Sequence, residues 1–180
     1  MSKKYEITDI THPDFPHLRR IRALRDIPVI GVKAGDLGGW VEGEHNLAHD
    51  SNAWVGDEAW VSGSARVVRS ARVSGSARVF DMARVSGSAQ VVRSAIVQSS
   101  EDIMHSMVLA SDQHSATLHR TTDGHLLTVG CWRGTVPEFR TMIESDTWVE
   151  ATPDQIELRR PELLAFTTMC EARIATWEPR

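Results

Sequence analysis

Residues 53–97 read AWVGDE-AWVSGS-ARVVRS-ARVSGS-ARVFDM-ARVSGS-AQVVRS-AIV, a pattern of Ala-x-Val-x-x-x that repeats every six residues without a slip. A short fixed period is typical of a solenoid, in which each unit buries its apolar face only against a stacked neighbour. The repeat therefore predicts a mainly β protein built around a β-solenoid. It indicates much less about what the protein does.

The alanine and valine of each unit are two residues apart. Side chains of a strand alternate between its faces, so both should point inward while the residue between them points outward. The outward residues are, in order, Trp54, Trp60, Arg66, Arg72, Arg78, Arg84, Gln90 and Ile96. The other three residues of each unit are rich in Gly, Ser and Asp, which suit a corner. Arg69, Asp81 and Arg93 have inward parity, but a corner can turn them toward water. A helix does not fit, because residues six apart advance about 240° around it.

Two arrangements of the units are open. Three units per turn would give the triangular left-handed β-helix of hexapeptide-repeat proteins, and two would give a flattened, two-sided solenoid. The triangular form is favoured by the pattern of an aliphatic residue followed four later by a small one, as in Val67 and Ala71. The recurrence of Ser-Gly-Ser at 62, 74 and 86, a spacing of twelve, points the other way.

The chain divides into three predicted parts. Residues 1–39 form an N-terminal mixed or capping segment, with strands expected over 4–8 and 18–24. Residues 40–100 form the solenoid, and its first turn, 40–52, consists of degenerate units in which Val41 and Leu47 keep the register. Such a turn would cover an open end, which otherwise exposes strand edges and core.

Residues 101–180 form a small α/β module in this interpretation. Strands are expected over 103–109, 116–120 and 126–131, the last two joined through the turn signal Asp123-Gly124. Thr135 followed by Glu138 is a capping box, and it predicts a helix over 136–145. Apolar residues at helical spacing predict a second helix over 161–177.

Charge and cysteine content bear on compartment and partners. Residues 59–100 hold six arginines and a single acid, Asp81, in a chain whose formal net charge is −4. Cys131 and Cys170 are too few for a disulfide framework and indicate reduced thiols. The N-terminus lacks the apolar run of a signal peptide, and no window is long and apolar enough for a membrane span. We therefore expect a cytoplasmic protein without a membrane partner.

Three segments resemble a family found in phages and prophages, often labelled hexapeptide transferase-like or polymer-forming proteins. They are residues 20–25 with 32–40, the repeat itself, and 120–124 with 130–134 and the helix that carries Glu138 and Phe139. The resemblance spans most of residues 18–145. It implies a phage or prophage origin and a protein that acts on host machinery in the host cytosol.

The sequence assigns no catalytic residue, no metal site and no cofactor. The alternative of a hexapeptide-repeat acyltransferase would need a ligand groove between subunits and a histidine as general base. The candidate bases are His45, His49, His105 and His114, all outside the regular repeat. For a metal, neither His12 with His17 nor His45 with His49 has a supporting cysteine or carboxylate pattern.

The arginines are the main functional cue. Arg66, Arg72, Arg78 and Arg84 should point outward at equivalent positions, with Arg69 and Arg93 at corners. Arginines in one column repel each other unless an anion neutralises them, and we considered an interface, a nucleic-acid or nucleotide site, and a plain solvated face. If the solenoid has two or three faces, these outward arginines would be divided among them, and each face would hold at most a pair. Outward Trp54 and Trp60 favour self-association or docking of the C-terminal module.

These observations favour a non-catalytic binding protein over an enzyme. We expect a dimer or trimer that engages or sequesters a host protein, with counter-defence as the specific role and with nucleic acid or a nucleotide as the other possible partner. The expected interface residues are Arg66, Arg69, Arg72, Arg78, Arg84, Arg93, Trp54 and Trp60.

Overall fold

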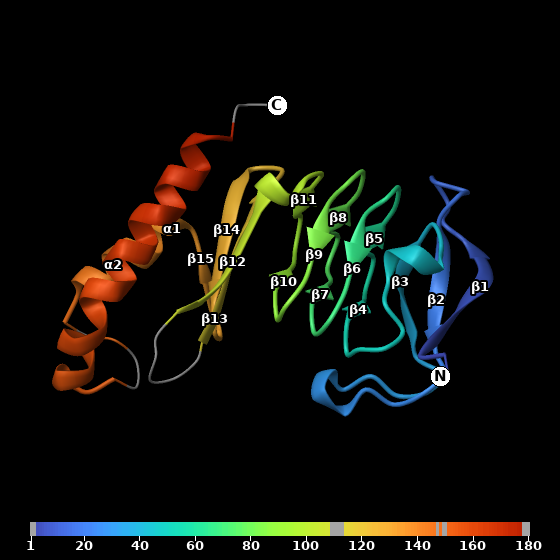
Figure 1. Ribbon diagram of the computed structural model, residues 1–180, viewed down its shortest axis with the longest axis horizontal. Coiled ribbons are helices and arrows are strands. Elements are labelled where there is room, and N and C mark those ends of the chain that lie inside the picture. The colour runs from blue at the N-terminus through green and yellow to red at the C-terminus, as the bar shows by residue number, and fades with distance from the viewer. Residues whose placement is uncertain (1–2, 109–113, 147, 149–150, 178–180) are drawn as a thin grey trace.

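The computed structural model describes residues 3–108, 114–146, 148 and 151–177. A short β-solenoid forms the middle of an elongated molecule (Figure 1). An antiparallel N-terminal segment lies at one end, and a four-stranded sheet backed by two helices lies at the other. The predicted β-solenoid with a small helix-and-sheet module is confirmed.

The eight regular hexads each contribute one short strand. They are β4 (Trp54–Val55), β5 (Trp60–Val61), β6 (Arg66–Val67), β7 (Arg72–Val73), β8 (Arg78–Val79), β9 (Arg84–Val85), β10 (Gln90–Val91) and β11 (Ile96–Val97). Each strand pairs in parallel with the strand three units away, as Trp54 does with Arg72 and Arg66 with Arg84. The solenoid is therefore three-sided. The twelve-residue spacing of Ser-Gly-Ser does not correspond to a turn.

The interior is as narrow as the repeat predicts. All eight alanines and all eight valines of the pattern are buried, and they form one core with the residues that close its ends. The fifth residue of seven successive units adopts a positive φ at the corners. These residues are Asp57, Gly63, Arg69, Gly75, Asp81, Gly87 and Arg93. The left-handed backbone turns Arg69, Asp81 and Arg93 out to water, where all three are exposed.

The N-terminal segment closes one end. Strands β1 (Tyr5–Thr11), β2 (Arg19–Ala23) and β3 (Leu37–Val41) are antiparallel, and β3 then continues in parallel with β5. Short 3-10 helices η1 (Pro28–Ile30) and η2 (Glu44–Asn46) interrupt the loops. Leu47 pairs with Val67, so the expected degenerate first turn is present.

Two buried polar residues help to seal this end. The Lys4 ammonium donates to the carbonyls of Ala48, Ser51 and Ala53 at 2.5, 3.0 and 2.6 Å. Burial lowers the pKa of Lys4 to about 8, so the group stays charged at neutral pH. Tyr5 donates its hydroxyl to the Leu47 carbonyl at 2.9 Å. These donors satisfy carbonyls that no further coil can reach.

The C-terminal sheet closes the opposite end. It consists of β12 (Ile103–Val108), β13 (His114–Thr121), β14 (Gly124–Val129) and β15 (Trp132–Gly134), in that order and all antiparallel, after the 3-10 helix η3 (Ser100–Asp102). One sheet face packs on α1 (Val136–Glu144) and α2 (Pro153–Ala175), which form a second core with it. Its other face meets the last solenoid coil.

Two side chains of β13 supply the hydrogen-bond acceptors that a further coil would otherwise provide. Inside the solenoid, the Arg72 and Ser74 amides donate to carbonyls of the next coil at 2.9 Å. In the last coil, the Gln90 amide donates instead to Thr117 Oγ1 at 3.1 Å, and the Val92 amide donates to His119 Nε2 at 3.4 Å. The sheet thus covers the open end with hydroxyl and imidazole acceptors.

The helices differ from expectation at one point. The Thr135–Glu138 capping box begins α1 as predicted. Helix α2 begins at Pro153, well before the predicted start at 161, because Thr152 and Gln155 form a second capping box. Pro161 lies inside the helix, and the predicted start there was wrong. The short edge strand β15 was not predicted.

Candidate interaction surface

The three solenoid faces differ in what covers them. We call the face of β3, β5, β8 and β11 the aromatic face, that of β4, β7 and β10 the covered face, and that of β6 and β9 the open face. The predicted ladder is divided among them, with Arg78 on the aromatic face, Arg72 on the covered face, and Arg66 with Arg84 on the open face. Only one pair remains in a column.

The aromatic face is overlaid by side chains of its own chain. Trp60 packs between Phe15 and Phe80, with ring centroids 5.8 and 5.7 Å apart, respectively. Arg20 lies over the ring of Trp40 at 4.4 Å and donates to Glu58 at 2.9 Å. Trp60 is therefore half-buried by the N-terminal loop and a corner residue, and not by the C-terminal module.

The covered face lies under the loop that follows β2. Trp54 is only 6% exposed and joins the solenoid core, with Ile30 and Val32 packed against that core. The Arg72 guanidinium donates to the Val29 carbonyl at 3.1 Å. The expectation that Trp54 marks a site for self-association or for the C-terminal module is wrong, because the N-terminal segment already buries this side chain.

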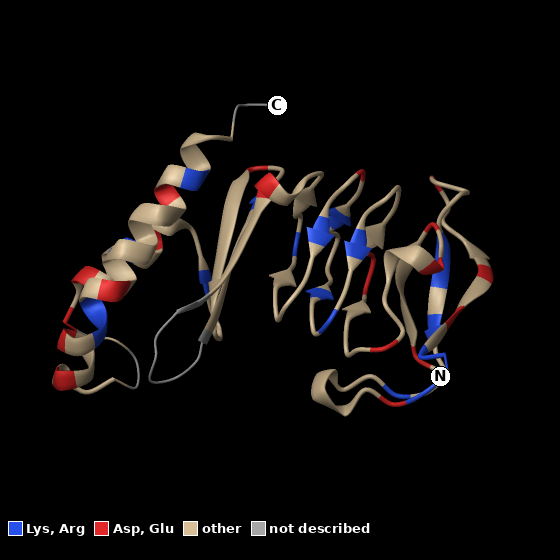
Figure 2. Ribbon diagram, viewed as in Figure 1, with Lys and Arg blue, Asp and Glu red and all other residues tan. Residues whose placement is uncertain are grey.

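The open face carries a pair of exposed arginines in direct register. Arg66 and Arg84 are cross-strand neighbours in a parallel pair, and coils of this kind lie about 4.8 Å apart. Figure 2 shows the two basic strands side by side on the solenoid, toward the viewer. Within the described ranges neither guanidinium has a hydrogen-bond or ion-pair partner. The pair is thus a concentration of uncompensated positive charge.

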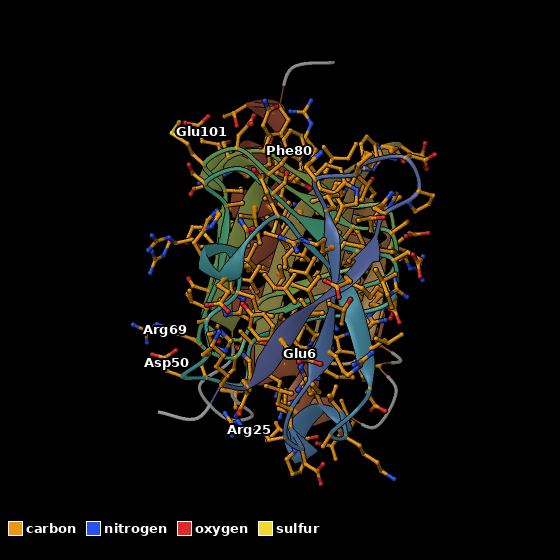
Figure 3. The ribbon with its side chains drawn as sticks, turned by 90° about the vertical axis from the view of Figure 1, so that its right-hand side faces the viewer. Glu6, Arg25, Asp50, Arg69, Phe80 and Glu101 are labelled. Atoms are coloured by element: carbon orange, nitrogen blue, oxygen red, sulfur yellow. The ribbon has the colours of Figure 1, made fainter. Side chains whose placement is uncertain are left out.

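Arg69 is a further exposed arginine at the edge of the open face, and in the view of Figure 3 it lies beside the labelled Asp50. It occupies the corner between β6 and β7, and Figure 3 shows it projecting from the solenoid, while Phe80 lies at a different corner. Arg93 occupies another corner, beside a polar hollow of about 280 Å³ that Asp123 and Glu138 also line. The structure therefore pairs Arg66 with Arg84 and places Arg69 at the corner that follows β6. It separates Arg72, Arg78 and Arg93, which lie on the other two faces or at another corner.

The described candidate histidines have structural contacts. His45 Nε2 lies 2.8 Å from the Gly63 carbonyl, and His49 stacks on Tyr5 with ring centroids 4.2 Å apart. His105 lies 3.1 Å from Thr117 Oγ1 and 3.3 Å from Ser88 Oγ, and burial lowers its pKa. The side chain of His114 lies outside the described residues. No observation favours the acyltransferase alternative.

The junction between the solenoid and the C-terminal module contains a groove that the sequence did not indicate. It has a volume of about 530 Å³ and includes Phe80, Arg120 and Trp177 in its lining. Arg120 lies 3.5 Å from the buried carboxylate of Asp102, and Trp177 donates its indole N–H to the Glu101 carbonyl at 2.9 Å. These contacts fasten the module to the last coil, so they explain the junction without a ligand.

Comparison with known proteins adds no function. No protein-family model, curated protein or solved structure matches the chain. Among the described residues, no three histidine, cysteine or acidic side chains gather as a metal site would require. In the same residues, no helix has the length and apolar character needed to cross a membrane. The functional proposal therefore rests on the exposed residues of the solenoid surface.

Proposed function

We propose that this protein is a non-catalytic binding protein that engages or sequesters a host component through the open face. The observation that carries the proposal is the Arg66–Arg84 pair, which is in register and exposed and has no ion-pair partner in the described part of the chain. Like charges directly opposite each other on a sheet are destabilising. A partner that brings negative charge to this face would relieve that repulsion and gain charge-assisted hydrogen bonds.

The setting that we propose comes from the resemblance of residues 18–145 to phage and prophage proteins. It places the protein in the host cytoplasm, with counter-defence as the specific role and a host protein as the partner. We also propose that it acts as a dimer or trimer. Nucleic acid is the competing partner, since arginine suits phosphate as well as carboxylate.

Affinity purification from host cells with quantitative mass spectrometry tests this proposal. The informative variant is Arg66→Glu/Arg84→Glu, which reverses the charge of the open face. The matched control is Arg19→Glu/Arg25→Glu, which makes the same charge change at two exposed arginines of the N-terminal segment. We expect one host component to accompany the wild type and the control, and to be lost with the open-face variant. Recovery of the same component with all three proteins would contradict the proposal.

A further inference from the structure

Two solenoid corners contain an internal carboxylate. Gly75 donates its amide to Asp57 Oδ2 at 2.8 Å, and Gly63 donates its amide to Glu42 Oε2 at 2.7 Å. In each case the acid comes from an earlier part of the winding and accepts from a glycine with a positive φ. At these two corners, a side-chain carboxylate thus accepts the hydrogen bond of the glycine N–H.

The third glycine corner, at Gly87, has the same backbone geometry, but a basic residue stands there in place of the acid. Gly87 has a φ of 70°, against 72° for Gly75, and its carbonyl accepts from Ser70 at 2.9 Å as that of Gly75 accepts from Glu58 at 3.0 Å. Asp57 lies one turn before Gly75 in the solenoid. The residue that lies one turn before Gly87 in the same way is Arg69. Among the described residues, no acceptor lies within hydrogen-bond distance of the Gly87 amide.

The surroundings of Gly87 suit an incoming anion. Gly87 lines a hollow of about 250 Å³ together with Arg84, Ser86 and Ser100, and no acidic side chain is in its lining. His105 borders the same hollow, and both of its ring nitrogens lie beside hydroxyl groups. An oxyanion here would meet the Gly87 N–H, serine hydroxyls and the Arg84 guanidinium, the kinds of donor that stabilise carboxylates in proteins.

We infer that the corner of Arg69 and Gly87 is a binding site for an aspartate or glutamate side chain of an acidic partner protein. The partner's carboxylate would accept from the Gly87 amide, as Asp57 accepts from Gly75, and would pair with Arg69. We favour a carboxylate over a phosphate because the chain itself places carboxylates at the two equivalent corners. This inference rests on the proposed function and specifies the chemistry of its partner.

A substitution that restores the internal carboxylate gives the sharpest test. Arg69→Asp reproduces the Asp57–Gly75 arrangement, and the Asp57 φ of 52° shows that aspartate fits the left-handed corner. The variant should therefore fold, while its own carboxylate occupies the site. Arg93→Asp is the matched control, since Arg93 is also exposed at a left-handed corner with a φ of 58°.

The probe is a fluorescent peptide of glutamates, compared with a fluorescent oligothymidine, and the readout is fluorescence anisotropy. We expect the wild type to bind the peptide, Arg69→Asp to weaken it by about tenfold or more, and Arg93→Asp to change it little. Equal losses in the two variants would overturn the site, because net charge alone would then explain the binding. Stronger binding of oligothymidine than of the peptide would also overturn it.

Glycine-selective ¹⁵N spectra report on the site itself. The Gly87 amide should shift when the glutamate peptide is added to the wild type, and also in free Arg69→Asp, while Gly75 stays in place. A Gly87 signal that is unchanged in both cases would overturn the inference. The inference can fail while the proposed function holds. In that case the host partner would be lost from the Arg66→Glu/Arg84→Glu variant but would still bind the Arg69→Asp variant.

Discussion

The stability of the protein should depend on pH through His119. Its Nε2 accepts from the Val92 amide at 3.4 Å, and its Nδ1 lies 3.3 Å from the Arg120 carbonyl, so the neutral ring with the proton on Nδ1 fits both partners. A proton on Nε2 would remove the acceptor that closes the last coil. Burial is the main reason that the pKa of His119 is lowered to about 4; nearby His125 acts in the same direction, and the hydrogen bond to the Arg120 carbonyl acts against it.

The direction and size of the effect follow from linkage. The unfolded pKa of histidine is about 6.5, so the unfolded chain binds the proton first as the pH falls. The contribution of neutral His119 is complete above about pH 6.5 and is lost progressively down to about pH 4. A difference of about 2.5 pKa units corresponds to about 3 kcal/mol in the free energy of unfolding.

Urea unfolding of the wild type and His119→Gln, followed by tryptophan fluorescence over this pH range, measures the effect. Burial also lowers the pKa values of His49, His105 and His125, but these groups titrate in both proteins. We expect the stability difference between the two proteins to narrow by about 3 kcal/mol between about pH 6.5 and pH 4. A difference that stays constant with pH would refute the role of neutral His119.

Three further changes test the solenoid. Arg84→Gln should raise the melting temperature in low salt, because like charges in register cost about 0.2–1 kcal/mol, and the gain should vanish in high salt; an equal gain in both salts would argue against repulsion. Asp57→Ala should lower the free energy of unfolding by about 2 kcal/mol, since the Gly75 amide loses its acceptor and alanine is less tolerant than aspartate of the left-handed φ of 52°; denaturant titration that detects no loss would contradict this. Gly39→Ala should cost about 1–3 kcal/mol, because a Cβ there would collide with the Ala59 carbonyl oxygen; an unchanged melting curve would show that the backbone yields.

The repeat made the solenoid predictable because its two periodicities are physical constraints. Alternation within a strand placed Ala and Val inside, and the six-residue unit set the corners. The number of units per turn was harder to predict, since residues such as Arg72 and Arg78 look alike in sequence but lie on different faces. Pairing three units apart separates them. The spacing of Val67 and Ala71 favoured this arrangement, but the twelve-residue recurrence of Ser-Gly-Ser pointed to two units per turn.

The candidate surface was only partly predictable for the same reason. Arg66 and Arg84 were expected to point outward, and they do. Trp54 was expected to do so too, but it is buried by a loop from residues about twenty positions earlier, a contact that the repeat does not record. The substitution of Arg69 for the corner acid is visible in the sequence only once the three-unit turn is known. The start of α2 could have been found from Thr152 and Gln155.

Native mass spectrometry on protein purified gently from the cells that produce it tests the central claim most directly. We predict that the wild type carries an acidic partner protein in a stoichiometric complex, and that Arg66→Glu/Arg84→Glu is free of it at an unchanged copy number. A wild type without any partner would contradict the claim that the open face binds one. So would a variant that differs from the wild type only in copy number, because the face would then join copies of the chain to each other.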